Sequence, residues 1–93
     1  MGEAFDPVAH VRKGWLWWEC EGCAHRHGVP VEGAQAWGWN GSTEAPTLKE
    51  SVMCNRGMPS QCHSQITDGQ VSWYGDCTHA LAGTVRPLPH FVW

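Results

Sequence analysis

The pattern of apolar and polar positions along the chain predicts short β-strands. Residues 14–20 read Gly-Trp-Leu-Trp-Trp-Glu-Cys, an aromatic-rich run typical of a strand, and residues 28–31 read as a short return strand. Residues 51–54 are a further candidate strand. Residues 78–83 are expected to form only one short helical turn, because so short a segment is not a stable helix by itself.

The clearest predicted element is a hairpin around Asp68-Gly69, a dipeptide typical of a two-residue type I′ turn. That turn sets the register, so Ile66 should face Val71 and Ser64 should face Trp73. Alternation along each strand then puts an apolar set on the core face and a polar set on the other. The core-face set is Cys62, Ser64, Ile66, Val71, Trp73 and Gly75, with Cys77 on the same face, and the outer set is His63, Gln65, Tyr74 and Asp76.

Length and charge limit the class of protein. A chain of 93 residues is expected to form a single domain, residues 1–93, here of five or six short strands with residues 1–13 as a loosely attached arm. A net charge of -3 lacks the basic footprint of a nucleic-acid binder, so nucleic acid is not an expected partner. No apolar run is long enough to span a membrane and no secretory signal is evident, so we expect a cytoplasmic protein.

The cysteines favour a metal site over disulfides, because five is an odd number and no secretory signal is present. Cys20 and Cys23 form a C-x-x-C pair, and the hairpin brings Cys62 and Cys77 together on its core face. Four thiolates in a tetrahedral arrangement bind structural zinc, which often stabilises small domains. We therefore predict zinc as the cofactor.

Other ligand sets stay open at this point. His79, His63 or His27 could replace one of the cysteines. Alternatively, Cys62 and Cys77 are buried core thiols without metal, since free cysteine is often buried. Cys54 is expected to be a spare thiol.

A second candidate site consists of His63, Asp76 and His79, which the predicted hairpin brings near one another. A carboxylate that orients an imidazole is the arrangement of general-base catalysis, and the same residues could form an open metal site that activates water. The structural alternative is that Asp76 caps the turn that follows and the imidazoles only make hydrogen bonds.

The tryptophans are expected to lie mostly in the core. On a strand over residues 14–20, Trp15 and Trp17 share one face and Leu16 and Trp18 the other. Some tryptophans could instead form a contact patch for a partner, because tryptophan is enriched at interfaces.

Six motifs together resemble a family of small phage and prophage proteins of unknown function, whose members often carry the description ammonia monooxygenase. The resemblance covers about residues 15–90, and its motifs are Trp18-Glu19-Cys20-Glu21-Gly22-Cys23 with His27, Gly38-Trp39-Asn40-Gly41, Ala45-Pro46-Thr47, Cys62-His63-Ser64-Gln65-Ile66-Thr67-Asp68-Gly69, Asp76-Cys77-Thr78-His79-Ala80-Leu81-Ala82-Gly83 and Leu88-Pro89. It implies a phage origin and a setting in the cytoplasm of the bacterial host. The enzyme description is not transferred, because ammonia monooxygenase is a large membrane complex. The chain departs from the family at Glu50-Ser51, where Pro-Ser is expected.

These observations predict a small, mainly β domain of short antiparallel strands with a zinc-stapled loop and hairpin. The leading functional hypothesis is a zinc-stabilised phage accessory protein that binds a host or phage protein. The alternative is a small hydrolase, metal-dependent or of the His/Asp type, that uses His63, Asp76 and His79.

Overall fold

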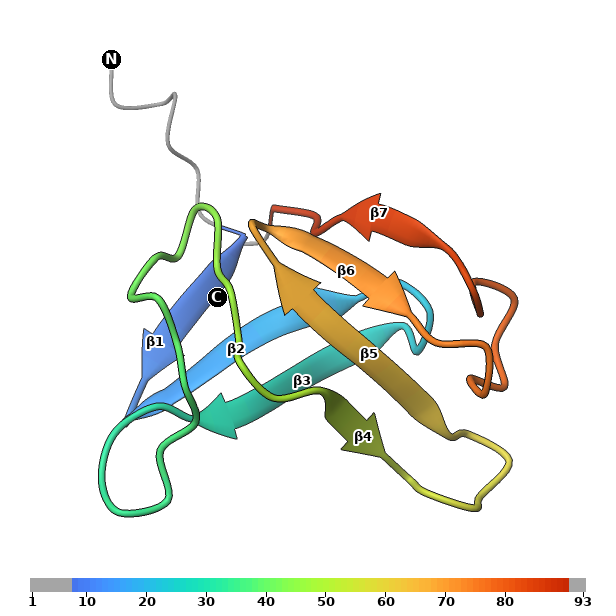
Figure 1. Cartoon of the computed structure of the whole chain (residues 1–93), viewed down its shortest axis with the longest axis horizontal. Helices are drawn as coiled ribbons and strands as arrows, with labels where there is room; N and C mark the ends of the chain where they lie inside the picture. The colour runs from blue at the N-terminus through green and yellow to red at the C-terminus, as the bar shows by residue number, and fades with distance from the viewer. Residues whose placement is uncertain (1–7, 91–93) are drawn as a thin grey trace.

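The computed structural model describes residues 8–90, which form seven short strands and no helix (Figure 1). The strands are β1 (Ala9–Arg12), β2 (Trp15–Cys20), β3 (His25–Pro30), β4 (Val52–Cys54), β5 (Cys62–Thr67), β6 (Gln70–Trp73) and β7 (Val85–Pro87). The strands pair antiparallel, in an N-terminal sheet of order β1-β2-β3 and a C-terminal sheet of order β4-β5-β6-β7. The predicted class, mainly β, is confirmed.

The N-terminal sheet is built on β2, whose side chains alternate as the sequence pattern predicts. Leu16 and Trp18 are almost fully buried, whereas Trp15 on the opposite face is 42% exposed. The rings of Trp15 and Trp17 stack on that outer face with their centroids 5.9 Å apart. The strand therefore gives one aromatic face to the core and one to the surface.

Two parts of the N-terminal sheet differ from the sequence prediction. Residues 9–12 were expected in a loose arm but form β1, which pairs with β2 and buries Ala9 completely; residues 1–7 of that arm lie outside the described residues. The return strand begins at His25 rather than at residue 28, because pairing continues to the end of β2, where Cys20 faces His25. In both places a neighbouring strand imposes an extended conformation that the local sequence signals only weakly.

The C-terminal sheet contains the predicted hairpin as β5 and β6. Ile66 faces Val71 and Ser64 faces Trp73, as the two-residue turn requires. Asp68 and Gly69 both have positive φ, 50° and 77°, which identifies the primed turn. Gly75, expected on the core face, is exposed, because β6 ends at Trp73 and the chain turns away. Strand β7 pairs with the free edge of β6. Residues 78–83 form turns instead of a regular helical turn.

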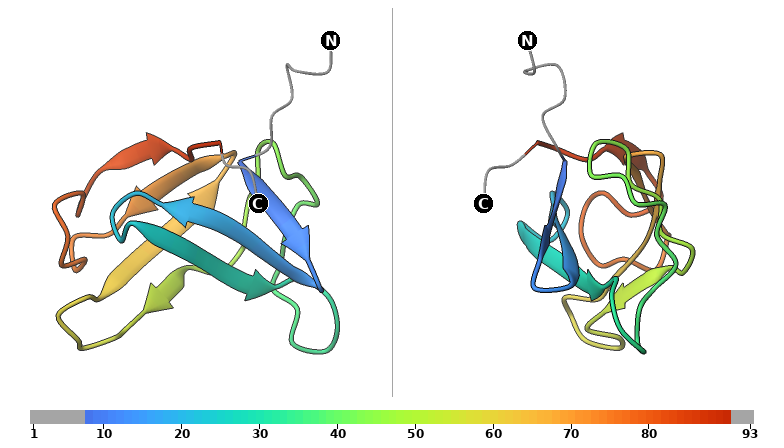
Figure 2. Two further views of the ribbon diagram at one scale, coloured as in Figure 1. Left: turned by 180° about the vertical axis from the view of Figure 1, so that it is seen from behind. Right: turned by 90° about the vertical axis from the view of Figure 1, so that its left-hand side faces the viewer.

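The core lies between the two sheets, which Figures 1 and 2 show as two layers with their strands crossing. Leu16, Trp18 and Val29 come from the N-terminal sheet, and Ile66, Val71 and Trp73 come from the C-terminal sheet. Cys20 and Cys62, one from each sheet, are buried in the same cluster. No helix among the described residues is long and apolar enough to cross a membrane.

Candidate active site and metal centre

Strand β5 separates two groups of chemically active side chains. Cys62, Ser64 and Ile66 point into the core, while His63 and Gln65 point outward, as alternation along a strand requires. The cysteines and the His63–Asp76 pair therefore lie on opposite faces of the same hairpin. Each group can be described by itself.

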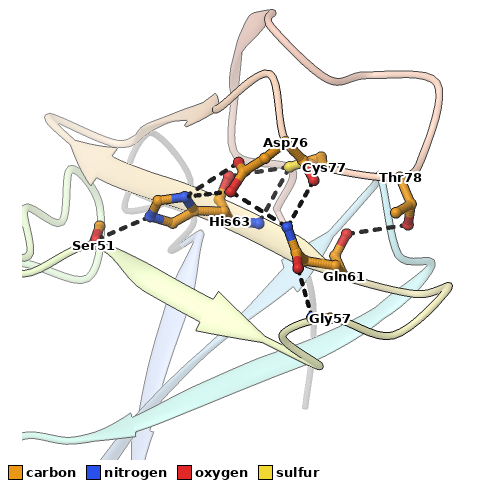
Figure 3. A network of polar contacts seen from close by, with 7 residues as sticks. All are labelled: Ser51, Gly57, Gln61, His63, Asp76, Cys77 and Thr78. Carbon is orange, nitrogen blue, oxygen red and sulfur yellow. Dashed lines mark hydrogen bonds and ion pairs between the residues drawn. The ribbon is translucent and has the colours of Figure 1, made fainter.

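On the outer face, the His63 ring lies between a carboxylate and a hydroxyl (Figure 3). Its Nδ1 is 3.2 Å from both carboxylate oxygens of Asp76, and its Nε2 is 3.2 Å from Oγ of Ser51. An ionised carboxylate only accepts hydrogen bonds, so Nδ1–H donates to Asp76. In the neutral ring Nε2 then accepts from the Ser51 hydroxyl. This is the arrangement that activates a serine as a nucleophile.

Two neighbouring side chains hold the His63–Asp76 pair. The Tyr74 ring packs on the His63 ring at a centroid distance of 4.2 Å. Nε2 of Gln61 donates to the backbone oxygen of Asp76 at 2.9 Å and to its carboxylate at 3.3 Å, while Oε1 of Gln61 accepts from the Gly57 amide at 2.7 Å. Figure 3 shows the Gln61 contacts and the His63–Asp76 pair forming one network. The carboxylate is thus held toward His63.

Cys77 holds the backbone of the same histidine. The His63 amide donates to Sγ of Cys77 at 3.2 Å, and the Cys77 thiol donates to the His63 carbonyl oxygen at 3.1 Å. Since Asp76 precedes Cys77, consecutive residues contact the His63 side chain and the His63 main chain. This double contact fixes the distance between the two segments that carry the imidazole and the carboxylate.

The three polar side chains lie at the protein surface. The side chain of His63 is 25% exposed and that of Asp76 is 48% exposed. Ser51 is exposed immediately before β4. All three side chains are therefore accessible from solvent.

On the core side, four potential ligands come together from both sheets. One donor atom each from Cys20, Cys23, His27 and Cys62 lies within 4.8 Å of the other three. The Sγ atoms of Cys20 and Cys62 are 3.9 Å apart. Two thiolates at about 2.3 Å from a tetrahedral zinc ion would be about 3.8 Å apart, so this spacing fits a shared ion.

A second group of three shares Cys62 with the first. It comprises Cys62, Cys77 and His79, and Nε2 of His79 is 3.5 Å from Sγ of Cys62. His79 also packs edge-on against the buried Trp73 ring. Cys62 is therefore a member of both possible ligand sets.

Burial and close neighbours shift the pKa values of the clustered groups. Burial acts to raise the pKa of Cys20, but the neighbouring His27 imidazole, the Cys23 backbone and the Trp73 side chain together outweigh it and lower that pKa to about 6. Burial raises the pKa of Cys23 to about 11 and also raises the pKa values of Cys54 and Cys62. Burial lowers the pKa of His79, and His27 adds to this shift. The cluster thus gathers several thiols that are costly to ionise without a compensating cation.

His27 provides a separate observation in favour of a metal. Its Nδ1 contacts Sγ of Cys54 at 3.3 Å, while its Nε2 is buried and has no hydrogen-bond partner among the described residues. Buried polar atoms are normally paired, so an orphaned imidazole nitrogen beside three thiols fits a metal ligand. The Cys/His cluster is a possible metal site.

The candidate residues from the sequence lie in three places, namely the two potential ligand groups and the outer face of β5. Cys20, Cys23, Cys62 and the substitute His27 form the first group; Cys77 and His79 belong to the second. His63 is in neither group and lies with Asp76 on the outer face. The four-cysteine ligand set stays a prediction.

Ser51 is the residue to which sequence analysis gave no role. It appeared only as the first residue of the candidate strand 51–54 and beside Glu50, the position that departs from the resembling family. The feature that brings Ser51 to His63 is the pairing of β4 with β5, the strand that carries His63. This pairing places Val52 opposite Ser64 and so brings the preceding Ser51 near the His63 ring. The sequence offers no turn dipeptide that sets this register, so the neighbourhood of Ser51 and His63 could not be derived.

One comparison with known proteins bears on this site. The model of a family described as bacterial ubiquitination-like system serine protease (BubE) matches residues 3–74. No curated protein and no solved structure matches the chain. The match contains Ser51 and His63 and ends two residues before Asp76. Since it covers well over half of the sequence, the chain belongs to the BubE family.

Proposed function

We propose that this protein is a serine protease whose catalytic triad is Ser51, His63 and Asp76. The observation that carries the proposal is the His63 ring, which contacts a serine hydroxyl through Nε2 and a carboxylate through Nδ1, at 3.2 Å each. The family description, which names a serine protease of a bacterial ubiquitination-like system, supports the same reading. The sequence-based hydrolase hypothesis is retained in modified form, with Ser51 in the place of His79.

The proposed reaction is acyl transfer through the serine. Ser51 Oγ attacks the carbonyl carbon of a peptide bond while its proton moves to His63 Nε2. His63 passes that proton to the departing amine, and the acyl group remains as an ester on Ser51. Water then attacks the ester and gives a proton back through His63, which restores the hydroxyl and releases the acid. Asp76 holds the ring and stabilises the imidazolium that forms.

The test is covalent labelling by a fluorophosphonate, which reacts with an activated serine and needs no knowledge of the substrate. We expect one adduct per chain, located at Ser51 by peptide mass spectrometry and absent in Ser51→Ala. Ser60→Ala is the matched control, because Ser60 is an exposed serine in the loop before β5. Labelling that persists in Ser51→Ala would reject the proposal.

We further propose that the metal is zinc and that it is bound by Cys20, Cys23, His27 and Cys62. Support comes from the 3.9 Å sulfur spacing, the orphaned His27 nitrogen and the preference of zinc for four cysteine and histidine ligands. In this assignment Cys77 does not bind the metal, and its thiol only makes hydrogen bonds with the His63 backbone.

Elemental analysis of the purified variants distinguishes this ligand set from the four-cysteine set. We expect one zinc per chain in the wild type and in Cys77→Ser, and loss of zinc in Cys20→Ser. Loss of zinc in a folded Cys77→Ser would favour the four-cysteine set, and the assignment would then be wrong. The role in binding a host or phage protein, the phage origin and the cytoplasmic setting stay predictions beside this proposed activity.

A further inference from the structure

The segment before β4 contains a large β-bulge. The Leu48 amide donates to the Ile66 carbonyl at 3.0 Å, and Val52 faces Ser64. Three residues, 49–51, therefore lie opposite the single residue Gln65 of β5. Bulges bend a strand and redirect a side chain, and they are frequent next to active sites.

The Gln65 side chain spans this bulge. Its Nε2 donates to the Leu48 carbonyl at 2.6 Å and lies 3.4 Å from the Glu50 carbonyl oxygen. The first carbonyl directly precedes residues 49–51 and the second belongs to one of them, where the backbone ladder between the two strands is interrupted. A side-chain amide thus takes the place of the missing backbone donor.

Gln65 and His63 act on the same segment from neighbouring positions. Both are outward-facing residues of β5, two positions apart. His63 contacts Ser51, while Gln65 contacts the backbone of the residues that lead to it. The other side of the segment is held by Gly38, whose carbonyl accepts from the Lys49 amide at 2.8 Å and whose amide donates to the Glu50 carboxylate at 3.1 Å.

We propose that Gln65 is a positioning residue, which sets the distance between the Ser51 hydroxyl and the His63 ring by bridging the bulge. This inference rests on the proposed serine protease activity. Catalytic groups must be held within about 0.5 Å of the productive geometry, and loss of the bridge would let the segment move away from His63.

The test compares Gln65→Met, which keeps the length but has no donor, with Gln65→Glu, which places a carboxylate against two carbonyl oxygens. Gln70→Met is the matched control, because Gln70 is an exposed glutamine of the same hairpin. The rate of fluorophosphonate labelling is measured against probe concentration. We expect the maximal rate to fall about 10- to 100-fold in both variants, with the half-saturating concentration little changed.

Three results separate the possibilities. Wild-type labelling rates in both Gln65 variants, with labelling lost in Ser51→Ala, would overturn the positioning role and leave the protease proposal intact. A loss of labelling that only follows the unfolded fraction measured by circular dichroism would also overturn it, because the effect would then be structural. Undiminished labelling in Ser51→Ala would overturn both proposals.

Discussion

At the scale of single residues, the exposure of Asp76 is the most unusual feature of the proposed triad. In a serine protease the carboxylate selects the tautomer with its proton on Nδ1, which leaves Nε2 free to accept the serine proton. Here that carboxylate is half-exposed, and its orientation depends on Gln61 and on the adjoining Cys77. The Asp76 carboxylate can both stabilise the imidazolium charge and select the tautomer of His63. We expect solvent to weaken the charge stabilisation more than the tautomer selection.

Asp76→Asn tests this separation. The amide can present its NH₂ group to Nδ1 and so favour the unreactive tautomer, without removing the Gln61 contact to the Asp76 backbone oxygen. We expect fluorophosphonate labelling of Ser51 to slow by about 100- to 10,000-fold, with the melting temperature changed little. A variant that labels like the wild type would show that Asp76 does not orient His63.

At the scale of elements, the β5–β6 hairpin determines which side chains meet. Its turn contains Gly69 with φ 77°, and a Cβ at this position would lie 3.2 Å from Cα of Ala45 and 3.3 Å from the Glu44 carbonyl oxygen. Gly69 also donates to the Pro46 carbonyl at 2.9 Å. The turn thus packs against the chain that later leads to Ser51.

Gly69→Ala is expected to destabilise the protein by about 1–2 kcal/mol from the strained φ, with a further cost from contact with Ala45. Gly41→Ala is the matched control, because Gly41 has φ 82° but no atom within 4 Å of the added Cβ. Thermal melting should therefore show a larger drop for Gly69→Ala than for Gly41→Ala. Equal drops would mean that the contact with Ala45 relaxes at no cost.

The same hairpin shows which contacts can be predicted from the sequence and which cannot. The turn dipeptide and the alternation predicted its register and both of its faces, and with them the His63–Asp76 contact, because these signals are local. The partners from outside the hairpin could not be predicted. Ser51 and the His27 ring reach their places through pairing of separate strands and packing of two sheets, and no local pattern encodes those contacts.

At the scale of the whole molecule, the Cys/His cluster joins the two sheets. Cys20 and His27 belong to the N-terminal sheet, and Cys62 belongs to the C-terminal sheet next to His63. A metal ion bound there would cross-link the two layers at the strand that carries the proposed catalytic histidine. Structural metal sites contribute directly to folding free energy, which matters in a domain this small.

Removal of the metal is therefore expected to lower the melting temperature by well over 10 °C, since each kcal/mol lost corresponds to about 4–8 °C in a domain of this size. Ser51 labelling should fall together with the folded fraction and return when zinc is added back, because in the proposed mechanism the metal supports the fold and takes no part in acyl transfer. Melting curves and labelling rates of the chelated and reloaded protein measure both effects. Labelling lost on chelation while the melting curve stays unchanged would instead place the metal in the chemistry, and a protein equally stable without metal would identify the cysteines as buried core thiols.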